Sequence, residues 1–222
     1  MLGTINVRKN FYTTDWPVLM FAYLVFYGFI YDRVIVFYEG LVMFILLIAF
    51  LYYLFKFQKT AVEDEAPEDD EVLPIGKMIL FLVLGGVGLW GGSELLVKGA
   101  KGMAEYYGVS QRVIGVTLVS IGTSIPELAA SIIAVLKKEK AISLGNLIGS
   151  NIFNIFAVLG ITSMITPLKA NDPALLGSDI YWMLAFALII LPLVFVPKGL
   201  RLGWRDGIIL LGGYLAFVYF TI

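Results

Sequence analysis

Long apolar stretches, separated by short polar segments, make up most of this sequence. A helix needs about 20 residues to cross the roughly 30 Å hydrocarbon core of a bilayer, and most of the apolar stretches approach that length. The pattern therefore predicts an all-α polytopic membrane protein with about seven transmembrane helices. We expect these spans at 16–31, 36–55, 79–97, 112–136, 142–165, 181–196 and 207–222.

Composition supports this class and excludes others. Of the 222 residues, 59% are hydrophobic and 15% are charged, whereas about a quarter of a soluble protein is charged. The chain has no His and no Cys, which excludes disulfides, thiol nucleophiles, His general bases and the usual zinc sites. The net charge of −1 does not indicate a nucleic-acid partner. Ser124 has no basic residue nearby to activate it, so we expect neither an enzyme nor a resident cofactor.

Lysine and arginine are unevenly divided between the two ends of the predicted bundle. One end holds Arg8, Lys9, Lys56, Lys59, Lys77, Lys137, Lys138, Lys140, Lys198, Arg201 and Arg205. The other end holds Arg33, Lys98, Lys101, Arg112 and Lys169. Because basic loops stay in the cytoplasm, we expect a plasma (inner) membrane protein with a cytoplasmic N-terminus and an external C-terminus.

A faint internal repeat relates the first two spans to the last two. The first copy is marked by Thr4–Lys9, Asp15-Trp16 and Glu39-Gly40, and the second by Thr166–Lys169, Asp179, Trp182 and Asp206-Gly207. The copies are offset by five spans, an odd number, so they insert in opposite orientations, as in many secondary transporters. We expect residues 1–57 to be the tail of a first repeat and 74–222 to be a complete five-helix second repeat.

An acidic segment separates these two parts. Seven of the 17 acidic residues lie between Glu63 and Glu71, and their repulsion together with Pro67 predicts an exposed cytoplasmic linker at 58–73. A calcium-sensing loop is the alternative, but the alternating ligands and central glycine of an EF-hand are missing.

The fourth span carries a polar face in its interior. Ser120, Thr123, Ser124 and Glu127 follow one another at i, i+3, i+4 and i+7, so three hydroxyls and a carboxylate share one side of the helix. A charge at that depth costs several kcal/mol unless it is paired, and no span has a Lys or Arg at the same depth. The missing counter-charge is therefore a bound cation or a proton.

Pro126 adds to this prediction. Proline has no N–H, so the carbonyl of Gly122 loses its helical partner, and we expect a kink or break there. In a membrane, a free carbonyl is tolerated where it lines a cavity or meets a ligand.

The fifth span has a second polar stripe. Asn146, Ser150 and Asn154 fall at i, i+4 and i+8, next to the small residues Gly145 and Gly149. Hydrogen bonding between helices would explain this stripe alone, but its closeness to the first stripe favours a shared site. All candidate ligands are oxygens, which suit hard cations such as Ca²⁺ and Na⁺.

Two motifs in these spans resemble a known signature. Gly122-Thr123-Ser124-Ile125-Pro126-Glu127, followed by the stretch from Gly145-Asn146 to Asn154, resembles the alpha repeat of the cation/calcium antiporter superfamily. The chain looks most like the membrane region of sodium/calcium exchangers, closely over 73–222 and loosely before. The resemblance implies two inverted five-helix halves that each donate an alpha repeat to a central site. It implies ion-ligand roles for the side chains of Thr123, Ser124, Glu127, Ser150 and Asn154 and for the backbone carbonyl of Ser120.

The chain departs from the family pattern in two ways. It contains one alpha repeat, so it resembles the last seven helices of a ten-helix exchanger, and the first alpha repeat is absent from residues 1–222. We expect either a fragment that lacks its N-terminal half or a protein that pairs with a second chain. Asn154 also stands where potassium-dependent relatives carry Asp, which argues against potassium dependence.

The resemblance and the polar stripes together predict Na⁺/Ca²⁺ antiport by alternating access, with the ions bound in mid-membrane at Glu127. H⁺/Ca²⁺ antiport is an alternative in which Glu127 binds protons instead of sodium. A half-exchanger that binds ions or a partner without transporting is a third possibility. In each case the expected partners are the lipid bilayer, the ions and a polypeptide that carries another alpha repeat.

Overall fold

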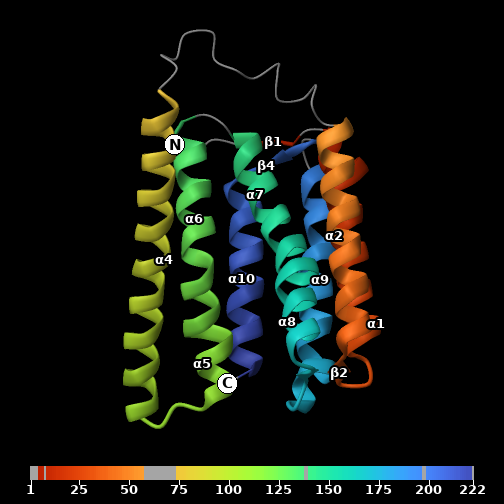
Figure 1. Cartoon of the computed structure of the whole chain (residues 1–222), viewed down its shortest axis with the longest axis vertical. Coiled ribbons are helices and arrows are strands. Elements are labelled where there is room, and N and C mark those ends of the chain that lie inside the picture. The colour runs from red at the N-terminus through yellow and green to blue at the C-terminus, as the bar shows by residue number, and fades with distance from the viewer. Residues whose placement is uncertain (1–4, 8, 58–73, 138–139, 197–198, 222) are drawn as a thin grey trace.

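The computed structural model describes residues 5–7, 9–57, 74–137, 140–196 and 199–221, so the expected acidic linker at 58–73 lies outside the described residues. The chain is a bundle of long helices (Figure 1). The helices are α1 (Trp16–Ile30), α2 (Phe37–Phe57), α4 (Ile75–Tyr106), α5 (Gln111–Ile114), α6 (Ser120–Leu136), α7 (Lys140–Phe153), α8 (Gly160–Ile165), α9 (Ile180–Phe195) and α10 (Trp204–Thr221). Four π-helical segments adjoin them: η1 (Phe11–Asp15), η2 (Gly115–Val119), η3 (Asn154–Leu159) and η4 (Leu175–Asp179).

Six helical stretches in the described part of the chain are long and apolar enough to cross a membrane. They match the first six predicted spans, and the 18-residue helix α10 occupies the seventh. This confirms the all-α polytopic class. The third span is longer than predicted, because α4 has 32 residues and is therefore roughly 48 Å long.

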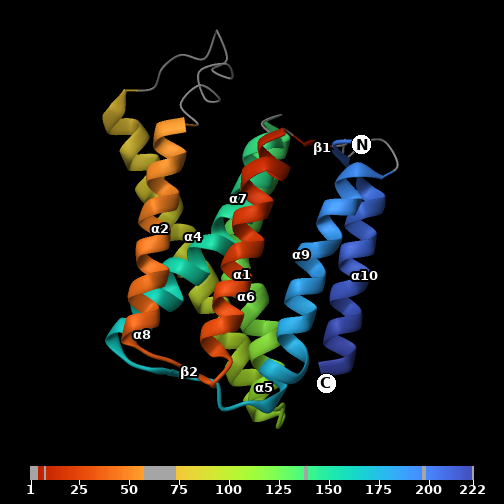
Figure 2. The same cartoon turned by 90° about the vertical axis from the view of Figure 1, so that its right-hand side faces the viewer.

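The best-packed part of the molecule lies where α1, α2, α7, η3 and α9 meet. Leu19, Met43, Ile152, Phe156 and Ala187 are buried there. The indole Nε1 of Trp16 donates a hydrogen bond of 2.7 Å to the carbonyl of Ala187, which fixes α1 against α9. Figure 2 shows α9 and α10 at one edge of the bundle. Helix α4 lies at another edge, as Figure 1 shows, and most of its side chains are exposed.

Two short antiparallel ribbons connect the helices at opposite ends of the bundle (Figure 1). In one ribbon β1 (Ile5–Asn6) pairs with β4 (Arg201–Leu202), and in the other β2 (Val34–Ile35) pairs with β3 (Leu168–Lys169). Each ribbon is extended by one further backbone hydrogen bond of 2.8 Å. Val7 N donates to the carbonyl of Leu200 in the first ribbon, and Ala170 N donates to the carbonyl of Arg33 in the second. Both acceptor residues have a positive φ, 52° for Leu200 and 70° for Arg33, although side chains disfavour that conformation.

The starts of the repeated helices also correspond. A π-helical segment that ends in Asp precedes both α1 and α9. The backbone N–H of Val36 donates to the Glu39 carboxylate ahead of α2 (2.9 Å), and that of Gly203 donates to the Asp206 carboxylate ahead of α10 (2.6 Å). The internal repeat predicted from the sequence is therefore present in the structure in two opposite orientations. The boundaries at residues 57 and 74 stay a prediction.

Candidate ion-binding site

One cavity gathers all six predicted ligands. It has a volume of about 440 Å³ and lies between α6 and the α7–η3 helix, with Tyr214 of α10 at its edge. The predicted ligands that line it are Ser120, Thr123, Ser124, Glu127, Ser150 and Asn154. Their roles as ion ligands stay a prediction.

The hydroxyls of Thr123 on α6 and Ser150 on α7 already donate hydrogen bonds within their own helices. Thr123 Oγ1 donates to the carbonyls of Val119 (3.0 Å) and Ser120 (3.1 Å), and Ser150 Oγ donates to the carbonyl of Leu147 (3.1 Å). A hydroxyl oxygen retains two lone pairs after donating its proton. The oxygens of Thr123 and Ser150 can therefore still accept a cation.

The carboxylate of Glu127, a half-buried residue, holds the one buried side-chain oxygen or nitrogen in the described part of the chain that lacks a hydrogen-bond partner. Its Oε2 atom is buried and has no hydrogen-bond partner among the described residues. A buried carboxylate oxygen without a donor or a cation is costly. The atom is therefore placed to receive a cation or to carry a proton.

The sequence predicted a kink or a break at Pro126, and the prediction of a break is wrong. Helix α6 runs from Ser120 to Leu136 as continuous α-helix with Pro126 inside it. The irregular backbone lies about two to three turns before Pro126, in the π-helical segment η2. Such segments are frequent at functional sites, and this one comes directly before the first predicted ligand, Ser120.

Asn146 forms hydrogen bonds between helices, which was the structural explanation considered for the second polar stripe. Its Nδ2 atom donates to the backbone carbonyl of Glu127 and to Ser131 Oγ, both at 3.2 Å. These two bonds hold α7 in register with α6. The stripe therefore divides into a structural end at Asn146 and a cavity-lining end at Ser150 and Asn154.

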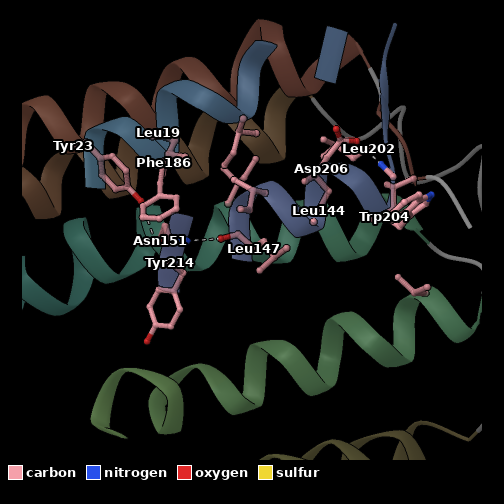
Figure 3. A pocket seen from close by; sticks show the side chains of 18 residues that line it. Leu19, Tyr23, Leu144, Leu147, Asn151, Phe186, Leu202, Trp204, Asp206 and Tyr214 are labelled. Carbon is pink, nitrogen blue, oxygen red and sulfur yellow. Dashed lines mark hydrogen bonds between the residues drawn. The ribbon is translucent and has the colours of Figure 1, made fainter. Parts of the chain in front are cut away.

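Asn151 is a cavity residue that we did not predict. Its Nδ2 atom donates to the carbonyl of Leu147 (2.8 Å), and its Oδ1 atom accepts from the Tyr23 hydroxyl of α1 (3.2 Å; Figure 3). It lines both this cavity and a larger neighbouring cavity. The sequence offered a weak signal, because Asn151 directly follows Ser150 but lies off the i, i+4, i+8 stripe.

An ion cluster joins the start of the α5–α6 helix to the segment before α9. The Arg112 guanidinium contacts Asp172 at 2.6 Å and Asp179 at 2.8 Å. A hydrogen bond from the backbone N–H of Ala174, together with Arg112, lowers the pKa of Asp172 below its usual 3.8. The cluster fixes one end of the helix that carries Glu127.

The donor set restricts which ions this site can hold. The described part of the chain has no group of three or more His, Cys, Asp or Glu side chains able to hold a metal. One carboxylate with hydroxyl, amide and carbonyl oxygens suits a hard cation and not a soft transition metal. Thr123, Ser124 and Asn154 are also exposed, so one side of the site is open.

Comparison with known proteins gives consistent results. The family model described as "Sodium/calcium exchanger protein" matches residues 77–222. The chain is 36% identical to a putative antiporter, CaxA of Alkalimonas amylolytica, over 99% of its own length and 70% of the relative's. It is 46% identical to the sodium/calcium exchanger MaX1 of Methanosarcina acetivorans over half of its own length and 31% of that protein's.

A solved structure has the same architecture. The sodium-calcium exchanger NCX_Mj superimposes with a TM-score of 0.73 at 28% identity. The match covers 99% of this chain and 68% of that structure. The chain thus corresponds to about two thirds of the putative antiporter CaxA and of the exchanger NCX_Mj, and to a smaller part of MaX1.

Proposed function

This chain belongs to the sodium/calcium exchanger family, and we propose that it contributes one of two alpha repeats to an Na⁺/Ca²⁺ antiporter. The family is one of ion exchangers and not of enzymes. The observation that carries the proposal is the buried Oε2 of Glu127, which has no hydrogen-bond partner among the described residues and lies in a cavity otherwise lined by neutral oxygen ligands and apolar side chains.

Competition for Glu127 explains how one ion drives the other. Ca²⁺ and Na⁺ both prefer oxygen ligands, and Glu127 is the one carboxylate that the described residues of this chain bring to the site. A bound calcium ion therefore excludes sodium from the same oxygens, and bound sodium excludes calcium. Alternating access follows when the site opens to one side of the membrane at a time.

A second alpha repeat is needed to complete the site. Calcium takes six to eight oxygen ligands that surround it, whereas the six predicted ligands all come from α6 and the α7–η3 helix. Side chains on two neighbouring helices cannot all face one ion. The exposed side chains of Thr123, Ser124 and Asn154 would otherwise face lipid, where polar groups are unfavourable. We assign the opposite side of the site to a missing N-terminal half or to a second chain.

Two other functions remain as alternatives. Proton-coupled calcium exchange is favoured by the same carboxylate, because Glu127 can carry a proton in place of sodium. A non-transporting half-exchanger is favoured by the open side of the site. The uneven distribution of Lys and Arg supports an inner-membrane location with the β1–β4 ribbon at the cytoplasmic end.

Calcium uptake into vesicles tests the proposal. The full chain is reconstituted alone, and also together with the part of CaxA that this chain leaves uncovered, under an imposed sodium or proton gradient. We expect uptake from the combination under the sodium gradient and none from the monomeric chain. Uptake driven only by protons would instead establish H⁺/Ca²⁺ exchange. Sodium-driven uptake by the isolated monomer would refute the need for a second repeat, and uptake that requires dimerisation would identify the second repeat as another copy.

A further inference from the structure

The π-helical segment η2 interrupts the regular hydrogen bonding of its helix immediately before the first predicted ligand. In an α-helix the backbone N–H of Ser120 would donate to the carbonyl of Val116, four residues earlier. In this chain the Ser120 N–H donates instead to the carbonyls of Gly115 and Thr117. The carbonyl of Val116 is therefore released from its α-helical partner.

A side chain from another helix hydrogen-bonds to this carbonyl. The hydroxyl of Tyr214 on α10 donates to the Val116 carbonyl oxygen at 3.3 Å. Figure 3 shows Tyr214 projecting from α10 toward the α5–η2–α6 helix. The centroid of the Tyr214 ring lies 6.3 Å from that of Phe217, which lies 6.0 Å from that of Trp182 on α9. These aromatic contacts orient the hydroxyl toward η2.

The number of residues in this turn decides where the later side chains point. Each residue advances a helix by about 100°, because 3.6 residues complete a turn. A π-turn contains one residue more than an α-turn. Conversion of η2 to α-helix would therefore rotate Thr123 and Glu127 by about 100° relative to α5.

The helix is attached to its neighbours on both sides of η2. Before η2, the Arg112 guanidinium is held by Asp172 and Asp179. After η2, the Glu127 carbonyl accepts a hydrogen bond from Asn146 on α7. Because both flanks are attached, the rotation of the ligand face relative to α5 depends on the turn between them. Among the described residues, the Tyr214 side chain is the one from another helix that hydrogen-bonds to this turn.

We propose that Tyr214 is a positioning residue for the ion site. It acts through the Val116 carbonyl, because stabilising the π-turn keeps the ligand face of α6 directed into the cavity. Tyr214 lies at the edge of that same cavity. This inference rests on the proposed function, since it assigns Tyr214 to the ion site of the exchanger. A merely structural tyrosine would stabilise the chain without changing its affinity for ions.

Calcium binding, measured separately from transport, tests this role. Tyr214→Phe removes one hydroxyl and keeps the aromatic ring, so the variant should fold. Tyr219→Phe is the matched control, because Tyr219 lies on the same helix, is 78% exposed and does not line the cavity. Each full chain is reconstituted with the part of CaxA that it leaves uncovered. Equilibrium calcium binding and sodium-driven calcium uptake are then measured on the same preparation.

A local measurement on the chain in detergent tests the hydrogen bond itself. Val116-Thr117 is the only Val-Thr pair in the sequence. Labelling valine carbonyls with ¹³C and threonine nitrogens with ¹⁵N therefore gives one NMR signal for this peptide group. The carbonyl resonance should move upfield in Tyr214→Phe, because the oxygen loses a donor, and should stay in place in Tyr219→Phe. An unchanged resonance in Tyr214→Phe would overturn the proposal.

We expect Tyr214→Phe to raise the calcium concentration for half-saturation about two- to tenfold, the factor that one hydrogen bond contributes. Tyr219→Phe should bind calcium like the wild type. Unchanged half-saturation in Tyr214→Phe, or an equal rise in both variants, would overturn the proposal. A rise confined to Tyr214→Phe in preparations whose wild type binds calcium but does not take it up would support the positioning role and contradict the proposed function. A wild-type preparation that binds no calcium would overturn both.

Discussion

Replacing Gly40 by alanine probes the close contact between α2 and α8. The new methyl group would collide with Ser163 Oγ and lie 2.5 Å from the Gly160 carbonyl. The Ser163 hydroxyl can rotate away only by giving up its 2.9 Å hydrogen bond to the same carbonyl. The backbone carbonyl has no equivalent freedom, so α2 and α8 must separate.

The magnitude follows from three contributions. Overpacking of a tight contact costs about 1–3 kcal/mol, and loss of the Ser163 hydrogen bond costs about 0.5–1.5 kcal/mol. Alanine recovers about 1 kcal/mol through its higher helix propensity. The net loss is about 0.5–3.5 kcal/mol, which lowers the Tm of a chain of this size by roughly 1–14 °C.

Gly207→Ala is the control, because Gly207 occupies the equivalent position on α10 with nothing within 4 Å. Its Tm should stay unchanged or rise slightly through helix propensity. Thermal unfolding of the two purified variants in detergent measures the difference. Equal Tm values would refute the assignment of Gly40 to a close backbone contact that α10 lacks.

Three further changes probe the site and its supports. Asn146→Ala removes the bonds to the Glu127 carbonyl and to Ser131, so the Tm should fall by several degrees, whereas an unchanged Tm would show that these bonds do not hold α7 to α6. The pKa of Asp172 is lowered in the folded chain, so its ion pair stabilises the protein at neutral pH and is lost as the pH falls below about 4. Between pH 7 and pH 3 the free energy of unfolding should therefore fall less for Asp172→Asn than for the wild type. Equal decreases for the two proteins would contradict this. Asn154→Asp adds a second carboxylate beside Glu127 and should change the ion preference, including any potassium dependence, in flux assays of the complete exchanger; an unchanged ion profile would place Asn154 outside the site.

The sequence predicted the spans and the gathering of the site residues because both depend on local periodicity. Ser120 to Glu127 share a face through helix geometry alone, and Ser150 and Asn154 follow the same rule on the next helix. These two helices are consecutive and antiparallel, so their polar faces can meet without information about the rest of the fold. The internal repeat was similarly indicated by the sequence positions of its acidic residues, Asp15 and Glu39 in the first copy and Asp179 and Asp206 in the second.

Features that depend on distant contacts were not predictable in this way. The link from Tyr23 to Asn151 and the cluster of Arg112 with Asp172 and Asp179 join residues 60 or more positions apart. The expected break at Pro126 was wrong because a single missing N–H did not end α6. The length of α4 was underestimated because Lys98, Lys101 and Glu105 lie beyond the apolar stretch, where i,i+4 ion pairs accompany the last helical turns.

Loss of the Glu127 charge tests the central claim most directly. Glu127→Gln keeps the shape of the side chain but removes the only carboxylate among the described residues that line the 440 Å³ cavity. Sodium-driven calcium uptake by the complete exchanger should fall at least about a hundredfold, equivalent to about 2.7 kcal/mol. Glu94→Gln is the control, since Glu94 is exposed and pairs with Lys98 at 3.0 Å, and it should transport normally. Wild-type uptake by a folded Glu127→Gln variant would contradict the account.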